Sequence, residues 1–330
     1  MTDRERVRVG GGIEGTTSSP EDVPLRTSAL RQRLGLALTG VIIVAIIVLV
    51  VRNRESFVET MRRVGPGGVA LSLLGGVVGI GATGLLWRTV LSGLGIEIRR
   101  SDALRVFFVS QLGKYLPGSV WPIVMQLEAA RHRGASRKAV LAGNLITLAI
   151  NVATGLLVAS ATLPFAYPQA LQRYWWALAA TPLLVVLALP RTLPYLLDRA
   201  LSMVHRPPLG VSLNSATMVR AAGWAVLSWV GLGVHIATLA AALNGFSTMV
   251  LILCTGGMSL AVCAGVLFIP APAGAGLREV VLGYVLVAVM TTSQALVVVV
   301  ASRVILILVD VLLAGGATAV GRLRQRATPL

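Results

Sequence analysis

The stretch LFIPAPAGAGLREVVLGY, Leu267–Tyr284, interrupts a long apolar part of the chain. Its prolines lack a backbone N–H donor, and its glycines allow backbone conformations that other residues avoid, so a continuous helix is not expected here. Two opposite charges follow at once. The interruption consists of Pro270, Pro272, Gly274, Gly276, Arg278 and Glu279. A break of this kind inside apolar sequence needs a physical reason.

The composition is that of a membrane protein that crosses the bilayer several times. The 330 residues are 55% hydrophobic and 13% charged, and the mean hydropathy is +0.81. A helix rises 1.5 Å per residue and must cross about 30 Å of hydrocarbon, which takes about 20 apolar residues. The candidate spans are Leu34–Val51, Gly67–Trp87, Val140–Ala161, Tyr174–Leu189, Ala222–Leu243, Thr248–Ile269 and Ala295–Gly321.

Two further apolar segments are poor candidates for ordinary spans. Ala103–Val124 contains GKYLPGSVW (113–121), with Lys114, Pro117 and Gly118 near its centre. Val280–Met290 is too short to cross the bilayer and directly follows the Pro/Gly break. Both are predicted to be arms of re-entrant hairpins that enter and leave on the same side. The expected fold is an all-α polytopic membrane protein with six to eight membrane segments, two of them Pro/Gly-broken re-entrant hairpins.

The two breaks also indicate an inverted repeat. Pro272 minus Pro117 is 155, and adding 155 to Gly67–Trp87 gives 222–242, which is itself a candidate span. The same addition to Val140–Ala161 gives 295–316, again a span. Inverted repeats in transporters bring their broken segments together near the middle of the membrane, where the substrate binds.

The formal net charge of +16 flanks the apolar spans instead of forming one patch, so the pattern does not favour nucleic-acid binding. Arginine-rich segments before the first span, at 88–138, at 191–221 and after the last span are expected on the cytoplasmic side. Both termini are then cytoplasmic. One loop disagrees with this orientation because Arg52, Arg54, Arg62 and Arg63 fall outside, partly offset by Glu55 and Glu59.

Charges inside the apolar spans are the best candidates for function. Arg303 and Asp310 are seven residues apart in the last span and share a helix face. An ionised side chain at the bilayer centre costs about 2.5–3.5 kcal/mol on insertion scales unless it is paired or hydrated. Either these residues fix the register of the helices, or an Arg binds an anion beside an acidic partner. Arg278 with Glu279 admits the same two interpretations, and Lys114 is either an interfacial residue or a phosphate contact.

The sequence contains no convincing motif for an enzyme active site or a cofactor site. G-x-G-x-x-G occurs at 79–84, but it lies inside an apolar span, where close helix packing through Gly75 and Gly79 explains it better. No ATP-binding or metalloprotease motif and no Cys/His cluster is present in the sequence. His235 is expected to make a hydrogen bond between helices, and Cys254 and Cys263 are expected to be buried apolar residues. We expect no metal, no cofactor and no enzymatic activity.

At these motifs the chain resembles the flippase-like integral membrane proteins related to the transmembrane domain of lysylphosphatidylglycerol synthase. The matching elements are GKYLPGSVW (113–121), the basic stretch EAARHRGAS (128–136), PAPAGAGLRE (270–279) and a late helix with Arg303. Many relatives have Pro-Gly-Gly where this chain has Pro272-Ala273-Gly274. The resemblance covers roughly Leu34 to Arg322, so we expect a basic cytoplasmic tail at 1–33, a transmembrane domain at 34–322 and a second tail at 323–330. It shows no aminoacyl-transferase domain before Leu330.

The resemblance implies a lipid flippase or transporter in the bacterial cytoplasmic (inner) membrane. Its substrate would be an anionic phospholipid or a polyprenyl-phosphate-linked sugar. The expected substrate-binding residues are Lys114, Tyr115, Pro117, Gly118, Trp121, Pro270, Pro272, Gly274, Gly276, Arg278, Glu279, Arg303 and Asp310. Without an ATP site the movement is downhill or ion-coupled, with Glu279 and Asp310 as candidate proton carriers. Two alternatives stay open: a non-transporting membrane partner of a cell-envelope glycosyltransferase, and a membrane-embedded glycosyltransferase that uses Glu128 or Glu279 as base.

Overall fold

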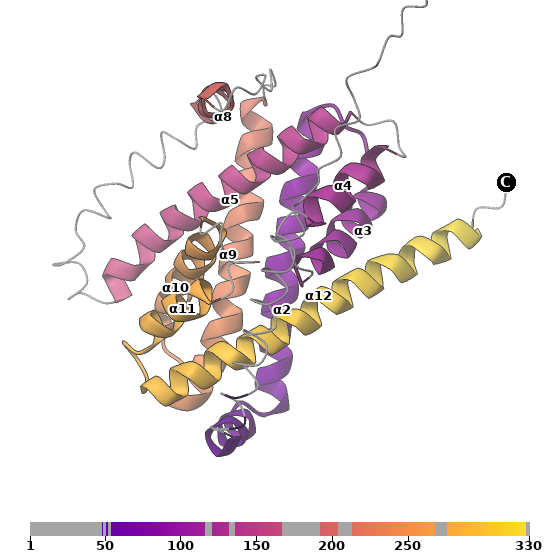
Figure 1. Ribbon diagram of the computed structural model, residues 1–330. Helices are drawn as coiled ribbons and strands as arrows, with labels where there is room; N and C mark the ends of the chain where they lie inside the picture. The colour runs from indigo at the N-terminus through magenta and orange to yellow at the C-terminus, as the bar shows by residue number, and fades with distance from the viewer. Residues whose placement is uncertain are drawn as a thin grey trace, which may run out of the picture.

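The fold was analysed in a computed structural model, which describes residue 48, residue 51 and residues 54–115, 121–131, 136–166, 192–203, 213–267 and 276–327. The described residues are almost entirely helical, and no strand occurs among them. The helices are α2 (Arg54–Gly93), α3 (Arg100–Gln111), α4 (Trp121–Arg131), α5 (Arg137–Ala166), α8 (Thr192–Met203), α9 (Ser215–Asn244), α10 (Thr248–Leu267), α11 (Leu277–Leu286) and α12 (Thr292–Ala327), with a short 3₁₀ turn, η1 (Leu112–Tyr115), after α3. Figure 1 shows their arrangement.

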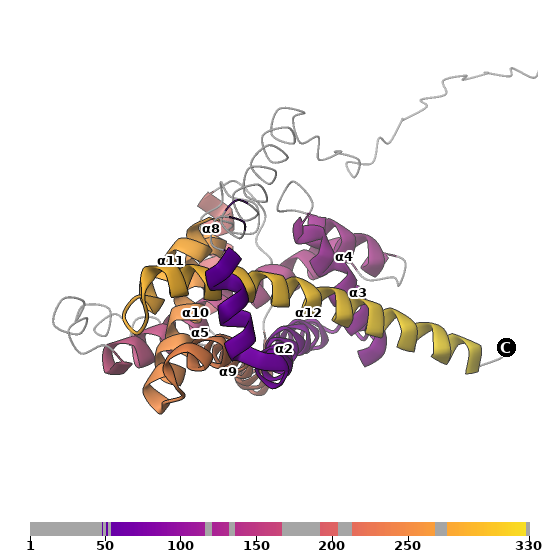
Figure 2. The same ribbon diagram turned by 90° about the horizontal axis from the view of Figure 1, so that it is seen from below.

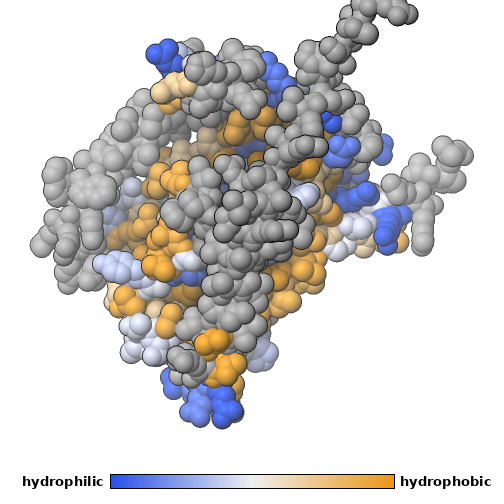
Figure 3. All heavy atoms as spheres, in the orientation of Figure 1, coloured by the Kyte–Doolittle hydropathy of each residue, from blue (hydrophilic) through white to orange (hydrophobic). Residues whose placement is uncertain are grey.

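Five of these helices, α2, α5, α9, α10 and α12, are long and apolar enough to cross a membrane. They correspond to five of the seven spans that hydropathy predicts, with α10 described only to Leu267 of Thr248–Ile269. The predicted spans Leu34–Val51 and Tyr174–Leu189 lie almost entirely outside the described residues. Where Figure 3 shows described residues, apolar side chains cover the flanks of the visible face, and most hydrophilic ones lie toward its ends. The chain is therefore a multi-pass, all-helical membrane protein.

Four of the described helices, α3, α4, α8 and α11, are too short to cross the bilayer. At 1.5 Å per residue, α3, α4 and α11 measure roughly 15–18 Å, about half of the hydrocarbon thickness. α3 packs against α4, and α10 packs against α11, so each pair forms a helical hairpin. The first hairpin is tied by the Gln126 side chain, which donates to Ser110 Oγ at 2.8 Å. The tips, with Pro117 and Gly118 in one and Pro272 and Gly274 in the other, lie outside the described residues. The membrane depth of both tips remains a prediction.

The two halves of the molecule repeat one order of elements. Adding 155 to α4 gives 276–286, and α11 is Leu277–Leu286. The same offset moves α2, α3 and α5 onto α9, α10 and α12. The contacts between helices follow the same correspondence. α3 packs against α12, and their equivalents α10 and α5 also pack together. α2 packs against α12, and their equivalents α9 and α5 do the same. The offset predicted from two prolines therefore relates two structural halves.

The first helices of the two halves, α2 and α9, run antiparallel and touch through their backbones. Partners of α2 descend along α9 as α2 proceeds, from Thr238 opposite Gly68 to Thr217 opposite Gly93. A Cβ atom added to Gly231 would lie 2.7 Å from Gly79 N and 2.9 Å from Gly75 O. Only glycine fits at such a distance, so the G-x-G-x-x-G segment is a helix-packing motif here.

Local signals explain where helices bend and end. α2 is kinked at Gly65, which has φ 62° and precedes Pro66, and the segment before this kink bends away from the rest of the helix (Figure 2). α9 begins after Asn214, whose side chain accepts from Thr217 N at 2.8 Å, and it ends at Gly245 with φ 81°. α12 then crosses the whole bundle, beginning beside α11 and passing α3 (Figures 1 and 2).

Candidate functional site

The site is built around α12, which carries Arg303 and Asp310 on one face. Seven residues are two helical turns, so their Cα atoms are about 10 Å apart along the axis. This separation is too large for an ion pair between them. Each side chain instead meets a residue from one of the two hairpins, Arg303 meeting the α10–α11 hairpin and Asp310 meeting η1 of the first.

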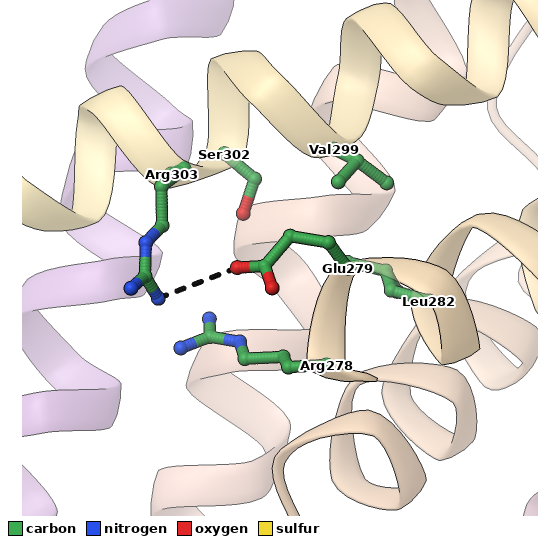
Figure 4. A pocket seen from close by; sticks show the side chains of 6 residues that line it. All are labelled: Arg278, Glu279, Leu282, Val299, Ser302 and Arg303. Carbon is green, nitrogen blue, oxygen red and sulfur yellow. Dashed lines mark ion pairs between the residues drawn. The ribbon is translucent and has the colours of Figure 1, made fainter. Parts of the chain in front are cut away.

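Glu279, in the first turn of α11, has two partners. Its Oε1 lies 3.5 Å from Arg303 Nη1 (Figure 4), and its Oε2 accepts from the Gly276 backbone N–H at 2.7 Å. Gly276 has φ 92°, a conformation that requires glycine, and it is the residue that precedes α11. Glu279 therefore holds the helix start and Arg303 together.

Arg278, unlike Lys114 and Arg303, makes no ion pair with a carboxylate in the part of the chain that the structure describes. The sequence suggested that Glu279 pairs with its neighbour Arg278, but the ion pairs among the described residues include Glu279 with Arg303 and none with Arg278. The partly buried Arg278 points into the same space as Arg303 and Glu279 (Figure 4), and its Nη2 lies 3.9 Å from Met258 Sδ. A thioether is a weak acceptor, so this contact does not replace an anion.

Asp310 is almost fully buried, with a side chain that is 1% exposed, and it binds the first hairpin. Its Oδ2 lies 2.6 Å from Lys114 Nζ and accepts from the Tyr115 hydroxyl at 2.5 Å. The Lys114 ammonium also lies 5.3 Å from the centre of the Tyr115 ring. Asp310 Oδ1 has no hydrogen-bond partner among the described residues. This carboxylate, which the sequence linked with Arg303, is thus the counter-ion of Lys114.

The two groups form one electrostatic cluster. Lys114 is close enough to Arg278 and Arg303 for their charges to interact, and Arg278 is close enough to interact with Asp310. Three cations and two carboxylates meet here, and three minus two leaves one positive charge. Because Glu279 and Asp310 each face another cation at close range, the excess charge resides on Arg278.

A small pocket lies where these side chains meet (Figure 4). Its empty space is about 190 Å³, including the open mouth. It is lined by Arg278, Glu279, Leu282, Val299, Ser302 and Arg303. The enclosed part of this space is only about 10 Å³, room for roughly one water molecule, whereas pockets that enclose a drug-sized ligand measure about 300–1,000 Å³. A single charged group of a larger molecule could therefore meet these side chains only at the open mouth.

Behind the pocket wall, His235 connects three spans. Its Nε2 lies 2.8 Å from Ser302 Oγ of α12, and its Nδ1 lies 2.8 Å from Ser72 Oγ of α2. His235 itself is fully buried in α9. The predicted hydrogen bond between helices is therefore confirmed, and it fixes Ser302 at the pocket.

Six of the thirteen predicted site residues come together in this cluster: Lys114, Tyr115, Arg278, Glu279, Arg303 and Asp310. Gly276 starts α11 beside them. Trp121 instead packs against Gly113, where an added Cβ would lie 3.1 Å from Trp121 Cβ, so it closes the first hairpin. The other predicted residues, Pro117, Gly118, Pro270, Pro272 and Gly274, lie outside the described residues.

Sequence reasoning missed Ser302 and Met258. Ser302 adjoins Arg303 in the chain, which was the only available signal, and Met258 stands in a uniformly apolar helix. In the part of the chain that the structure describes, no group of three His, Cys, Asp or Glu side chains could hold a metal ion. Cys254 and Cys263 are free and buried, as expected.

Comparison with known proteins identifies the family. A family model described as the lysylphosphatidylglycerol synthase TM region matches residues 36–314 of this chain. No curated protein matches it significantly. The match spans most of the 330 residues, including both hairpins and the charged cluster. The chain therefore belongs to the lysylphosphatidylglycerol synthase transmembrane-region family.

Proposed function

We propose that this protein moves a lipid with an anionic headgroup across the cytoplasmic membrane of a bacterium, and that it is not an enzyme. The observation that carries the proposal is the excess positive charge on Arg278 at a pocket between the short helix α11 and the span α12. An uncompensated charge in a low-dielectric site costs several kcal/mol, so it is favourable only when an anion or water reaches it. The family itself is one of lipid-related membrane proteins.

The proposed mechanism uses the two hairpins as a polar path through hydrocarbon. Arg278 binds the phosphate of the headgroup while the acyl or prenyl tails stay in lipid. Glu279 keeps Arg303 beside the same space, and Lys114 supplies a further cation next to Asp310. Groups fixed in this way replace the hydration that the headgroup loses on leaving water.

The substrate class is an anionic phospholipid or a polyprenyl-phosphate-linked sugar, because each offers a phosphate to a guanidinium. Both termini are proposed to be cytoplasmic, on the distribution of arginines. The predicted loop after the first span is helical from Arg54 on, as the start of α2. Part of the disagreement there is relieved, since Arg63 lies 2.9 Å from Glu59 and Arg62 lies 4.0 Å from it.

The test compares two Arg→Gln variants of the same pocket. Purified protein is reconstituted into liposomes with fluorescent phosphatidylglycerol or fluorescent polyprenyl phosphate, and translocation is followed by quenching of the outer leaflet. We expect wild-type protein to move at least one of them, Arg278→Gln to slow this movement about 100-fold or more, and its thermal midpoint to be unchanged or higher. Loss of the charge-assisted contact to phosphate accounts for a roughly tenfold to 100-fold slower translocation, and loss of the positive charge along the path accounts for the rest.

Arg303→Gln is the matched control. It leaves Glu279 without its cation, so we expect a lower thermal midpoint as well as slower transport. The proposal is overturned if neither anionic lipid moves faster than in protein-free liposomes, or if Arg278→Gln transports like wild type. Both alternatives, a non-transporting membrane partner of a glycosyltransferase and a membrane-embedded glycosyltransferase, would show the first result.

A further inference from the structure

A stripe of uncharged polar side chains on α5 is not used by the proposed anion pocket. Asn144, Thr147, Asn151 and Thr154 follow one another at spacings of three and four residues, so they share one face of the helix. This polar face of α5 lies between two faces that pack against other helices. On one side Gly143 lies against Leu91 of α2, and on the other Gly155 lies against Cys263 of α10.

Three members of this stripe have polar atoms that bind nothing among the described residues. These atoms are Asn144 Nδ2, Thr147 Oγ1 and Asn151 Oδ1, and all three are buried. Thr147 as a whole is only 8% exposed. Buried polar groups in proteins nearly always have a partner, so three unpartnered ones within two turns indicate a missing ligand or water.

Asn144 is held in a fixed orientation. Trp87 Nε1 donates to Asn144 Oδ1 at 2.6 Å, which occupies the amide oxygen and leaves the Nδ2 group as a free donor. Asn151 Oδ1 is a free acceptor, and the Thr147 hydroxyl can both donate and accept. The stripe therefore offers donors and acceptors in close alternation without any charge.

The structural repeat shows which residues of α12 are equivalent to this stripe. With the offset of 155 residues, Asn144 corresponds to Val299, Thr147 to Ser302 and Asn151 to Leu306 of α12. Val299 and Ser302 line the anion pocket. α5 thus presents its unpartnered polar atoms at the positions from which the equivalent helix lines the charged pocket.

We propose that Asn144, Thr147 and Asn151 form a second, uncharged subsite that binds the hydroxyl groups of a polyol or sugar headgroup. Each hydroxyl is both a donor and an acceptor, which matches the alternation on α5 and does not match a phosphate or an ammonium group. The inference rests on the proposed function and narrows its substrate class to lipids that carry a hydroxylated headgroup on an anionic phosphate.

The test measures competition between two lipids of equal charge. Full-length protein in phosphatidylcholine nanodiscs binds fluorescent phosphatidylglycerol, and phosphatidylinositol or phosphatidylmethanol displaces it. Both competitors carry one phosphate charge, but only phosphatidylinositol has a hydroxylated ring. We expect wild-type protein to prefer phosphatidylinositol about tenfold, the value of roughly one or two hydrogen bonds.

Thr147→Val with Asn151→Leu removes two of the three free atoms while keeping the size of the side chains. We expect the preference to disappear and the thermal midpoint to rise, because unpartnered polar groups become apolar ones. Thr147→Ser keeps the hydroxyl and should keep the preference. Thr154→Val is the matched control on the same face, since Thr154 already donates to Ile150 O and accepts from Trp229 Nε1. It should lower the midpoint and leave the preference intact.

The inference is overturned if wild-type protein shows no preference, which would mean that water alone meets these atoms, or if the double variant keeps the wild-type ratio. If the double variant does not fold, Thr147→Val alone is the test. It should lower the preference for phosphatidylinositol by about half on a logarithmic scale. Arg278→Gln separates the two proposals, because it should weaken both competitors equally. Equal binding by Arg278→Gln and wild type would contradict the anion pocket and leave the test of α5 valid.

Discussion

Lys114 and Asp310 form a pair whose two members differ in their access to water. The Lys114 side chain is 29% exposed and Asp310 is 1% exposed. If Asp310 is neutralised, the ammonium can still reach water along its flexible stem. If Lys114 is removed, the carboxylate stays buried with only the Tyr115 hydroxyl. The pair therefore stabilises the fold chiefly by making the burial of Asp310 possible.

We predict that Lys114→Met destabilises the protein more than Asp310→Asn does. Breaking a buried ion pair by removing one partner costs about 3–5 kcal/mol of stability. The loss is smaller when the residue left unpaired is the more exposed one, as Lys114 is in Asp310→Asn. The double variant should recover most of the loss, because neither member of the pair is then left without its partner. Thermal unfolding of the four proteins in one detergent measures this cycle. An Asp310→Asn midpoint at or below that of Lys114→Met would contradict the assignment.

The charged residues could be predicted from the sequence, but their partners could not. Ionised residues inside apolar spans are rare enough that Arg278, Glu279, Arg303 and Asp310 stand out directly. Neighbours in a helix point about 100° apart and seldom pair, so the adjacency of Arg278 and Glu279 in the sequence was a misleading sign of an ion pair, although both side chains reach the same pocket. The links from His235 to Ser72 and Ser302 depend on how three helices align, which local sequence does not determine.

At the scale of elements, the glycines of α2 and α9 set the distance between the two halves. The contact is between backbones, with Gly231 against Gly75 and Gly79. Side chains can adjust to a neighbour, but a backbone in a helix cannot. The spacing of glycines along α2 was visible in the sequence, whereas the partner glycine on α9 was not, because many spans here contain glycine.

We predict that Gly231→Ala lowers the thermal midpoint, by the equivalent of about 1–3 kcal/mol for overpacking. Gly223→Ala is the control in the same helix, because a Cβ there meets nothing within 4 Å. It should be neutral or slightly stabilising, since alanine favours helix over glycine. Equal midpoints for the two variants would show that α2 and α9 do not meet through these glycines.

The spans themselves were predictable because hydrocarbon forces apolar sequence into helices of a known length. The hairpin arms were predictable because Pro and Gly interrupt that pattern. Helix bounds differ from the predicted ones by several residues, as in α11, which ends at Leu286 instead of Met290. Hydropathy alone does not mark this end, since the residues from 287 to 290 are as apolar as the helix.

At the scale of the whole molecule, the repeat and the arginines together predict the orientation. Single cysteines introduced at Ser18 and Thr328, in a background in which Cys254 and Cys263 are alanine, should resist an impermeant thiol reagent in intact cells. Both should react after the cells are opened. Labelling of only one terminus in intact cells would require an odd number of crossings and would contradict the proposed topology.

The single excess charge at the pocket has a consequence for the energy source of transport. With one headgroup charge bound, the loaded site is electrically neutral, whereas the vacant site carries +1. A membrane potential acts on a charge with about 2.3 kcal/mol per 100 mV, and bacterial cytoplasm is the negative side. The voltage therefore draws the vacant site toward the cytoplasm and does not oppose the loaded site on its way out. On the proposed function, the resting potential would favour outward movement of an anionic lipid, so the rate of translocation should depend on the membrane potential.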